Sequence, residues 1–317
     1  MKTIRIVFLS LLLLSIAGCS KDYYEGIDPH QTFIASVNIL EPSINFYDQS
    51  AKILATWSLE KAYTGATLIS HDAILLYGNQ LTEADLYELS SGKHMKSIQT
   101  GIGITNAYYD EHSDAIFMTN SKTNELLSFT RNGKIKRNIR IGNYPMAMHA
   151  DGEKLYVINY KDTTLSIIST TKLEVIDEWQ IPKSSNGLFI SHKTNELWIG
   201  GHGEGSKPND AVYVYELTTG KKLKEVLMPL MPIAFSYKED EVAVVSHGTN
   251  MLYVANLNGD IISQQEIAAN PFAVAHFKEQ LVVAGYDDQS LYFIQDNEIQ
   301  HRVKTGNGPF QLLVREG

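Results

Sequence analysis

Two histidines, His202 and His247, are the residues of this sequence best suited to chemistry near neutral pH. An imidazole changes charge close to its ordinary pKa of about 6.5, so it can serve as a general acid, a general base or a metal ligand. Neither histidine stands in an established catalytic spacing, because the sequence contains no H-E-x-x-H, no G-x-S-x-G and no G-x-x-x-x-G-K-[ST]. The Gly-rich stretch at 201–206 opens no helix, so we expect a loop there and no phosphate cradle.

Both histidines belong to a series of residues at equivalent places in a repeated unit. The series consists of Asn38, Asn79, Ser121, Tyr160, His202, His247 and Tyr286. If the repeats form a ring, the two histidines and two tyrosines lie in a polar and aromatic crescent, and Asn79 and Ser121 are further candidates for contact with a ligand. Such a crescent could bind a small molecule, a glycan or a peptide. Polar residues are also expected at strand ends where no ligand binds.

Two other interpretations of the histidines remain open. As neighbours on adjacent repeats, they could share a metal ion, but no acidic residue is evidently placed beside them, so we expect no metal and no cofactor. Alternatively, the protein is an enzyme in which His202 and His247 act as base and acid, with Glu204 or Asp287 assisting. The enzymatic interpretation predicts that both imidazoles and a carboxylate converge within hydrogen-bond reach.

The elements that position these residues come from a repeat. Its copies are aligned on Gly65, Ile104, Pro145, Asn186, Pro232, Pro271 and Pro309, at intervals of 39, 41, 41, 46, 39 and 38 residues. Each copy resembles four short β-strands separated by turns, such as Asn132-Gly133 and Asn258-Gly259, a strong hairpin signal. Four-stranded units recurring about every 40 residues predict a β-propeller. The extra residues of the longest interval are best placed within 202–210.

The two ends of the chain indicate the number of blades. The last copy has room for one strand, "PFQLLVRE", and the N-terminal region supplies three, "TFIASVN", "SINFYD" and "KILATWSL". We therefore predict an all-β, seven-bladed propeller with four antiparallel strands per blade. The ring would be closed by a composite blade of N-terminal strands and the C-terminal strand, which removes an open sheet edge. An open β-solenoid or two sandwiches are the alternatives.

One copy, "NYPMAMHADGEKLYVINYKDTTLSIISTTKLEVIDEWQIP" (143–182), closely resembles the YVTN repeat, with Tyr156-Val157-Ile158-Asn159 at the name motif. "AIFMTN" (115–120) and "NPFAVAHF" (270–277) are weaker copies, and the Trp-Asp pair of WD40 repeats is absent. The resemblance implies a seven-bladed propeller of bacterial surface and periplasmic proteins. It fixes no function, because its motifs are strand and turn residues. Propellers of related shape include lactonases and streptogramin lyases, to which the enzymatic alternative would correspond.

The N-terminus is similar to the signal peptide of a bacterial lipoprotein. Lys2 and Arg5 precede an apolar core, and Ile16-Ala17-Gly18-Cys19 resembles a lipobox, in which the cysteine is acylated, for example with palmitate. The core is shorter than the roughly 20 residues of a spanning helix. We predict a signal peptide over 1–18, a lipidated tether over 19–31 and the propeller over 32–317. Cys19 is the single cysteine, so no disulfide is expected.

Charge and processing together favour a role in the cell envelope. Removal of Lys2 and Arg5 changes the formal charge from −9 to −11, which argues against nucleic-acid binding. We expect a monomer, held by its lipid at the cell membrane or the outer membrane and outside the cytoplasm. Its predicted function is non-enzymatic binding or scaffolding of a protein, glycan or small ligand; an assembly factor for other envelope proteins is a further possibility.

Overall fold

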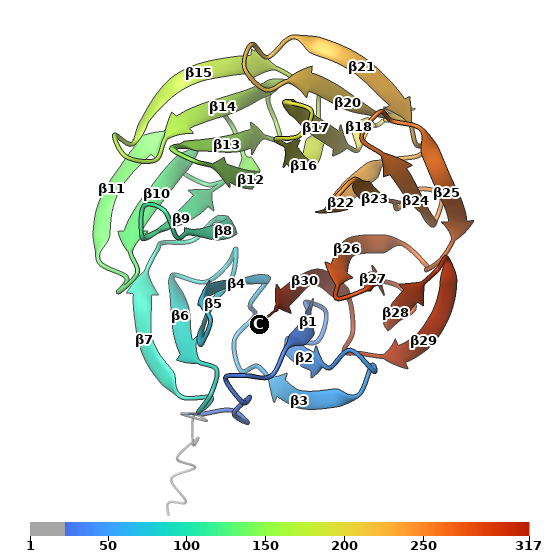
Figure 1. Cartoon of the computed structure of the whole chain (residues 1–317). Coiled ribbons are helices and arrows are strands. Elements are labelled where there is room, and N and C mark those ends of the chain that lie inside the picture. Colours follow the sequence, from blue (N-terminus) through green and yellow to red (C-terminus); the bar gives the residue numbers. More distant parts are fainter. Residues whose placement is uncertain (1–22, 317) are drawn as a thin grey trace, which may run out of the picture.

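The computed structural model describes residues 23–316 as a ring of seven four-stranded antiparallel sheets around a central axis (Figure 1). This arrangement confirms the predicted all-β, seven-bladed propeller. Within the described range there is no helix, and hence none long and apolar enough to cross a membrane. The predicted signal peptide and Cys19 lie outside the described residues, so their processing stays a prediction.

Blades 1 to 4 follow one another along the chain. Blade 1 consists of β4 (Gly65–Ser70), β5 (Ala73–Tyr77), β6 (Glu83–Glu88) and β7 (His94–Gln99). Blade 2 consists of β8 (Ile104–Asp110), β9 (Ala115–Asn120), β10 (Glu125–Thr130) and β11 (Ile135–Arg140). Blade 3 consists of β12 (Pro145–Asp151), β13 (Lys154–Asn159), β14 (Thr164–Ser169) and β15 (Glu174–Gln180). Blade 4 consists of β16 (Ser185–Ser191), β17 (Glu196–Gly201), β20 (Ala211–Glu216) and β21 (Lys222–Leu227).

The remaining blades complete the ring. Blade 5 consists of β22 (Pro232–Lys238), β23 (Glu241–Ser246), β24 (Met251–Asn256) and β25 (Ile261–Glu266). Blade 6 consists of β26 (Pro271–Phe277), β27 (Gln280–Gly285), β28 (Ser290–Gln295) and β29 (Glu298–Lys304). The composite blade consists of β30 (Pro309–Arg315), β1 (Phe33–Asn38), β2 (Ser43–Tyr47) and β3 (Ile53–Ser58). The extra residues of the long interval fall within 202–210, as predicted, but they form a small hairpin of β18 (Gly203–Glu204) and β19 (Lys207–Pro208) where a loop was expected.

Ring closure occurs in the composite blade, where the last strand pairs with the first. The β1–β30 ladder runs from Phe33 opposite Arg315 to Asn38 opposite Pro309, and Figure 1 shows β30 as the innermost strand beside β1. The predicted composite blade is thus confirmed. Because β1 is covered by β30 on its inner side, the blade has no unpaired inner edge strand between the chain ends.

The hydrophobic core is divided among the blade interfaces. Seven clusters of buried apolar side chains occur, and each joins two neighbouring blades, including the two interfaces that flank the composite blade. Trp57 and Trp198 are the largest fully buried side chains. A single sheet would expose both of its apolar faces, so each blade depends on its two neighbours for burial. The closed ring is therefore one cooperative unit.

A backbone feature explains the Asn-Pro and Gly-Pro pairs of the repeat. The residue before the innermost strand has a left-handed backbone in several blades, with φ of 55° at Asn270 and 67° at Gly308. Glycine and asparagine adopt this conformation at little cost. The proline that follows begins the strand, where its missing N–H group disturbs the ladder least. Tyr144 and Met231 occupy the same place with φ of 56° and 58°.

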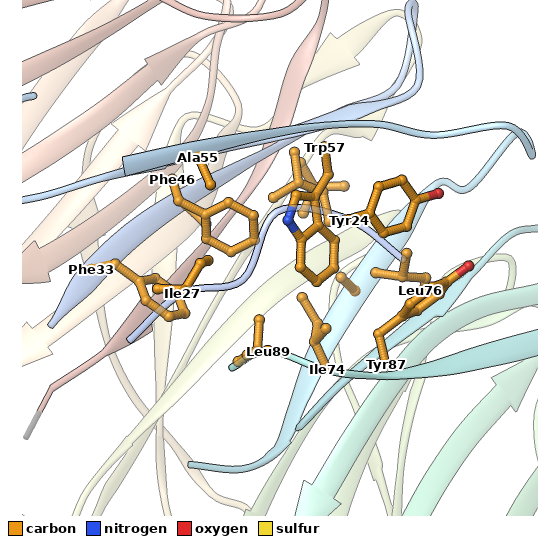
Figure 2. Packing of buried hydrophobic residues seen from close by; sticks show 14 of the residues in the cluster. Tyr24, Ile27, Phe33, Phe46, Ala55, Trp57, Ile74, Leu76, Tyr87 and Leu89 are labelled. Atoms are coloured by element: carbon orange, nitrogen blue, oxygen red, sulfur yellow. The ribbon is translucent and has the colours of Figure 1, made fainter. Parts of the chain in front are cut away.

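The described part of the predicted tether is docked onto the propeller. Residues 23–31, here called the strap, lie between the composite blade and blade 1 (Figure 2). The Tyr24 ring stacks on Trp57 with ring centroids 4.8 Å apart, and the Tyr24 backbone N–H donates to the carbonyl of Gly92. Arg315 donates to the carbonyl of Gln31, which ties the strap to the closing strand. From Tyr23 onward this segment is thus part of the folded domain and not a free linker.

Candidate functional site

The candidate residues lie at one end of the ring, as their alignment predicts. Tyr160 follows β13, His202 follows β17, His247 follows β23 and Tyr286 follows β27, so each comes directly after the second strand of its blade. Neighbouring antiparallel strands reverse direction, so the turns after all second strands lie on the same face of the propeller. The connections between successive blades lie on that face as well. We call it the crescent face.

Ring contacts join these residues into a continuous series. Tyr160 lies against His202 at 5.9 Å between centroids, His202 against His247 at 5.0 Å, and both contacts are edge-to-face. His247 contacts Phe272 at 5.2 Å, and Phe272 in turn contacts Tyr286 at 5.1 Å. The series ends with Phe310 on one side, 5.2 Å from Phe272, and Tyr144 on the other, 6.1 Å from Tyr160. The aromatic crescent is defined as Tyr144, Tyr160, His202, His247, Phe272, Tyr286 and Phe310.

Three members of the crescent were missed by the sequence analysis. Phe272 and Phe310 are the second residues of the innermost strands β26 and β30, directly after the prolines that begin them. Tyr144 is the residue before Pro145, at the left-handed position described above. The sequence could have indicated them, because each is next to a proline on which the repeats are aligned, and these prolines lie on the same face. All seven rings are half-buried, so each keeps some surface open to solvent.

Asn79 and Ser121 occupy the predicted strand ends but are engaged by the scaffold. The Asn79 side-chain amide donates to Ser121 Oγ at 3.4 Å, and that hydroxyl donates to the carbonyl of Gly103 at 3.1 Å. Asn38 is buried and donates to Asn45 Oδ1 at 2.8 Å. In blades 1 and 2 this position therefore holds the turns together, whereas in blades 3 to 6 it bears rings. In the composite blade Ile39, and not Asn38 as aligned, occupies it, because the N–H of Ile39 donates to Gly308 as that of Tyr160 donates to Tyr144.

The two imidazoles differ in their surroundings. Nδ1 of His247 lies 2.9 Å from Oδ1 of Asn270, whereas Nε2 of the same ring is buried. Burial, together with the nearby His247, lowers the pKa of His202 to about 4, so His202 is neutral at physiological pH. Within residues 23–316, Nδ1 of His202 and Nε2 of His247 are buried without a hydrogen-bond partner.

The carboxylates that the enzymatic alternative requires do not join the histidines. Glu204 is exposed in the β18–β19 hairpin, 3.8 Å from the Nζ of Lys183, and Asp287 is exposed beside Tyr286. Over residues 23–316, no carboxylate hydrogen-bonds to His202 or His247, and no group of three or more His, Cys, Asp or Glu side chains is arranged to hold a metal. The geometry therefore does not supply the acid–base pair that this alternative predicts.

A cavity of about 350 Å³ occupies the central channel and is lined by residues of the innermost strands. Phe272 and Phe310 belong both to this lining and to the crescent, which places the crescent at the mouth of the channel. A hollow of about 540 Å³ between blades 5 and 6 is lined by charged side chains that pair with one another, such as Lys238 with Glu279. Another hollow of about 480 Å³ is lined in part by Tyr108 and Tyr109, and of the crescent only Phe272 and Phe310 line the channel cavity.

Comparison with known proteins identifies the fold and no family. No family model matches the sequence, and no curated relative is found. A functionally unknown protein from Desulfotomaculum acetoxidans aligns with a TM-score of 0.76 at 10% identity, over 90% of this chain and 99% of that one. The dihydro-heme d1 dehydrogenase NirN in complex with DHE gives 0.68 at 13%, over 89% and 65% of the two chains. Hydrazine synthase from Kuenenia stuttgartiensis gives 0.68 at 10%, over 80% and 89%.

These similarities support the propeller fold alone, because the identities are so low. The solved structures differ in the activities that their names describe, so the shared architecture does not select one of them. The specific resemblance to the YVTN repeat is matched by no family model.

Proposed function

We propose that this protein is a lipid-anchored, YVTN-type propeller outside the cytoplasm, which binds a ligand at the aromatic crescent without transforming it. The observation that carries the proposal is the uninterrupted series of seven rings at the channel mouth, from Tyr144 in the approach to blade 3 to Phe310 in the composite blade. Large half-exposed rings around a concavity are typical of ligand sites, since they supply apolar contact area at a small entropic cost.

Tyr144 adds a ring at a strained backbone position. A bulky residue with φ of 56° is strained by about 1–2 kcal/mol; blade 6 has asparagine and the composite blade glycine at this position, whereas blade 5 has Met231. The Tyr144 ring contacts Tyr160, and the Nζ of Lys161 lies 4.5 Å from the centroid of Tyr144. The ligand classes that suit such walls are glycans, peptides and small planar molecules.

The strap gives a geometric reason why an anchor would leave the crescent accessible. Tyr23 pairs with Lys93 in the turn between β6 and β7, which lies at the end of the blade opposite the crescent face. Tyr23 is four positions after Cys19, and an extended chain of that length spans at most about 14 Å. A lipid on Cys19 would therefore hold the opposite face near the membrane, with the crescent directed toward the aqueous compartment.

A thermal-shift screen tests the ligand site. The full chain in detergent is heated with envelope glycans, short peptides and metabolites, in parallel with the double variant Tyr160→Ala/Phe272→Ala. A ligand present at 100 times its Kd stabilises the folded state by about 2.7 kcal/mol, which raises Tm by several degrees. Tyr23→Ala is the matched control, because Tyr23 is 70% exposed and distant from the crescent face.

The expected result is a compound that raises Tm for the wild type and for Tyr23→Ala but not for the double variant. Compounds that stabilise the double variant equally, or a screen without any stabilising compound, would contradict a ligand site at the crescent.

A further inference from the structure

The exposed apolar side chains of the ring are concentrated at one end of the outermost strands. In every blade, one or two of them occur within the first three residues of the fourth strand. They are Ile53, Met95, Ile135, Val175, Ile176, Leu223, Ile261, Ile262 and Ile299, here called the apolar rim. Within residues 23–316, the other exposed large hydrophobic residues are Tyr23, Leu40, Ile102 and Leu227. Exposed apolar residues are ordinary where they are scattered singly, so their recurrence at one place in all seven blades needs a cause.

A β-bulge marks this place in every blade. The ladder between the third and fourth strands shifts register, which leaves one residue of the fourth strand unpaired, such as Ile176 in blade 3 and Leu223 in blade 4. The same shift occurs in the other five blades. Bulges keep an edge strand from pairing with another chain, a role that requires no apolar residue. Blades 2 and 6 have Lys136 and Gln300 at the bulge, so the fold accepts polar residues there, and in both an isoleucine precedes the bulge.

The apolar rim lies at the end of the ring opposite the crescent face. Each fourth strand begins at the turn from the third strand, and neighbouring antiparallel strands reverse direction, so this turn lies on the opposite face. The strap meets the ring on the same face, where Tyr23 pairs with Lys93. By contrast, Leu40 and Ile102 lie in connections of the crescent face, and Leu227 ends β21 there.

We propose that the apolar rim contacts the lipid bilayer, so that the propeller lies with its whole opposite face on the membrane. This inference rests on the lipid anchor of the proposed function. The described chain begins at Tyr23, and Cys19 lies four positions earlier, so an anchor holds this face within about 14 Å of the lipid. Tyr23 is itself exposed, and tyrosine is enriched at the boundary between membrane and water.

The distribution of the rim around the ring favours a bilayer over a protein partner. The fourth strands are the outermost strands of their blades, so the rim follows the circumference of the molecule (Figure 1). A globular partner would cover one sector of this circle, whereas a bilayer extends beneath all seven blades. Apolar side chains bind at the boundary of head groups and acyl chains through the apolar area that they bury. The formal charge of −9 gives no general attraction to anionic lipids, so an uncharged bilayer should suffice.

Fluorescence quenching in vesicles tests this contact. Single-cysteine variants of the full chain are produced in bacteria, purified with their lipid and reconstituted into phosphatidylcholine vesicles with or without a spin-labelled lipid. Acylation of Cys19, the single cysteine of the sequence, leaves the introduced thiol as the site for an environment-sensitive dye. Ile176→Cys and Leu223→Cys place the dye in blades 3 and 4, which lie across the ring from the strap (Figure 1).

Two controls separate contact of the whole face from simple tethering. Leu227→Cys is the matched control for Leu223→Cys, because both leucines are exposed, 67% and 48%, at opposite ends of the same strand. Met95→Cys places the dye close to the strap, two residues after Lys93, where an anchor alone would bring it near the lipid. Circular dichroism of each labelled variant checks that the ring is folded.

The expected result is that the spin-labelled lipid quenches the dye by about half or more at Met95, Ile176 and Leu223, and by much less at Leu227. Equal quenching at both ends of β21, or quenching at Met95 alone, would overturn the contact of the whole face. In a protein that floats with the vesicles, that failure leaves the lipid anchor and the crescent site standing. A protein that does not float with the vesicles would overturn the anchor together with this inference, so the two failures are distinguishable.

Discussion

Asp85 provides a quantitative test of how blade 1 is held to its neighbour. Its side chain is only 1% exposed and accepts hydrogen bonds from Tyr63 and Ser97, as well as from the Nζ of Lys61 at 2.7 Å. Burial alone would raise the pKa of Asp85, but the hydrogen bonds from Lys61, Ser97 and Tyr63 outweigh it and lower the pKa. The ionised carboxylate is therefore stabilised by the folded state.

The perturbation is Asp85→Asn, which keeps one oxygen but replaces the other with an NH₂ group facing hydrogen-bond donors. A hydrogen bond to a charged acceptor contributes about 1.5–3 kcal/mol. Tyr63 and Ser97 donate to different oxygens of Asp85, so in the variant one hydroxyl faces the NH₂ group and the other keeps only a neutral acceptor. Lys61 is 38% exposed, so its ion pair is screened by solvent and adds little. Since the amide retains part of these bonds, we expect the free energy of unfolding to fall by about 2–4 kcal/mol at pH 7.

The assay is urea unfolding of the wild type and Asp85→Asn at pH 7 and at several values below about pH 4, the ordinary range of an aspartate pKa. A lowered folded-state pKa gives stability that is fully present above the unfolded-state pKa and is lost as the pH falls through the folded-state value. The difference between the two proteins should therefore shrink in acid.

Asp114→Asn is the matched control. Asp114 also contacts a tyrosine hydroxyl and a cation, Tyr109 at 2.6 Å and Arg131 at 2.8 Å, but its side chain is 61% exposed. Its substitution should cost clearly less than that of Asp85, because water replaces the lost contacts. The reasoning is refuted if both substitutions destabilise equally, or if the effect of Asp85→Asn is undiminished in acid.

Two further predictions concern the ends of the chain. Truncation after Thr305 removes β30 and leaves β1 as an open edge. The lost ladder bonds and burial should lower the free energy of unfolding by more than about 5 kcal/mol, so circular dichroism should show a largely unfolded chain. A stably folded truncated monomer would contradict closure by the composite blade. Replacement of Cys19 by Ala should move the protein from the membrane fraction to the soluble fraction after cell disruption, and unchanged membrane association would contradict lipid anchoring.

The fold was predictable because its determinants recur in most blades. The left-handed residue before the innermost strand and the tight turn between the third and fourth strands each require particular residues, such as Asn270 and the Asn258-Gly259 pair. These local requirements repeat about every 40 residues, so the sequence alone indicates the period and the number of blades. Complementary strands at the two ends then leave ring closure as the simplest way to complete the last sheet.

The docked strap could not be predicted from its own composition. Residues 23–31 contain charges, a glycine and a proline, which are typical of a linker. Their order comes from tertiary contacts: Tyr24 fits beside Trp57 and Tyr87, and Ile27 is buried with a backbone bond to the carbonyl of Leu89. These partners belong to two different blades, so the contact is visible only when the ring is assembled.

The crescent was predicted only in part, because repeat equivalence identifies some of its residues and not others. Equivalence within the repeat suffices to bring Tyr160, His202, His247 and Tyr286 to one face, whereas Phe272 lies at the register irregularity between Pro271 and Ala273, where simple alternation does not say which side a residue faces. The same irregularity occurs at the start of the innermost strand in blades 2 to 5, so it belongs to the repeat, but strand alternation alone does not reveal it.

The departure from the repeat is itself an argument for function. At the place that bears rings in blades 3 to 6, blades 1 and 2 have Asn79 and Ser121, small polar residues that bond to the scaffold. The fold is thus satisfied by a small hydrogen-bonding residue at this position and does not require an aromatic side chain. Features that the fold requires are shared by all blades, so rings confined to four consecutive blades, and in mutual contact, have a cause outside the folding of the ring. A ligand that spans those blades would supply that cause, and replacing the four rings individually should then alter binding much more than stability.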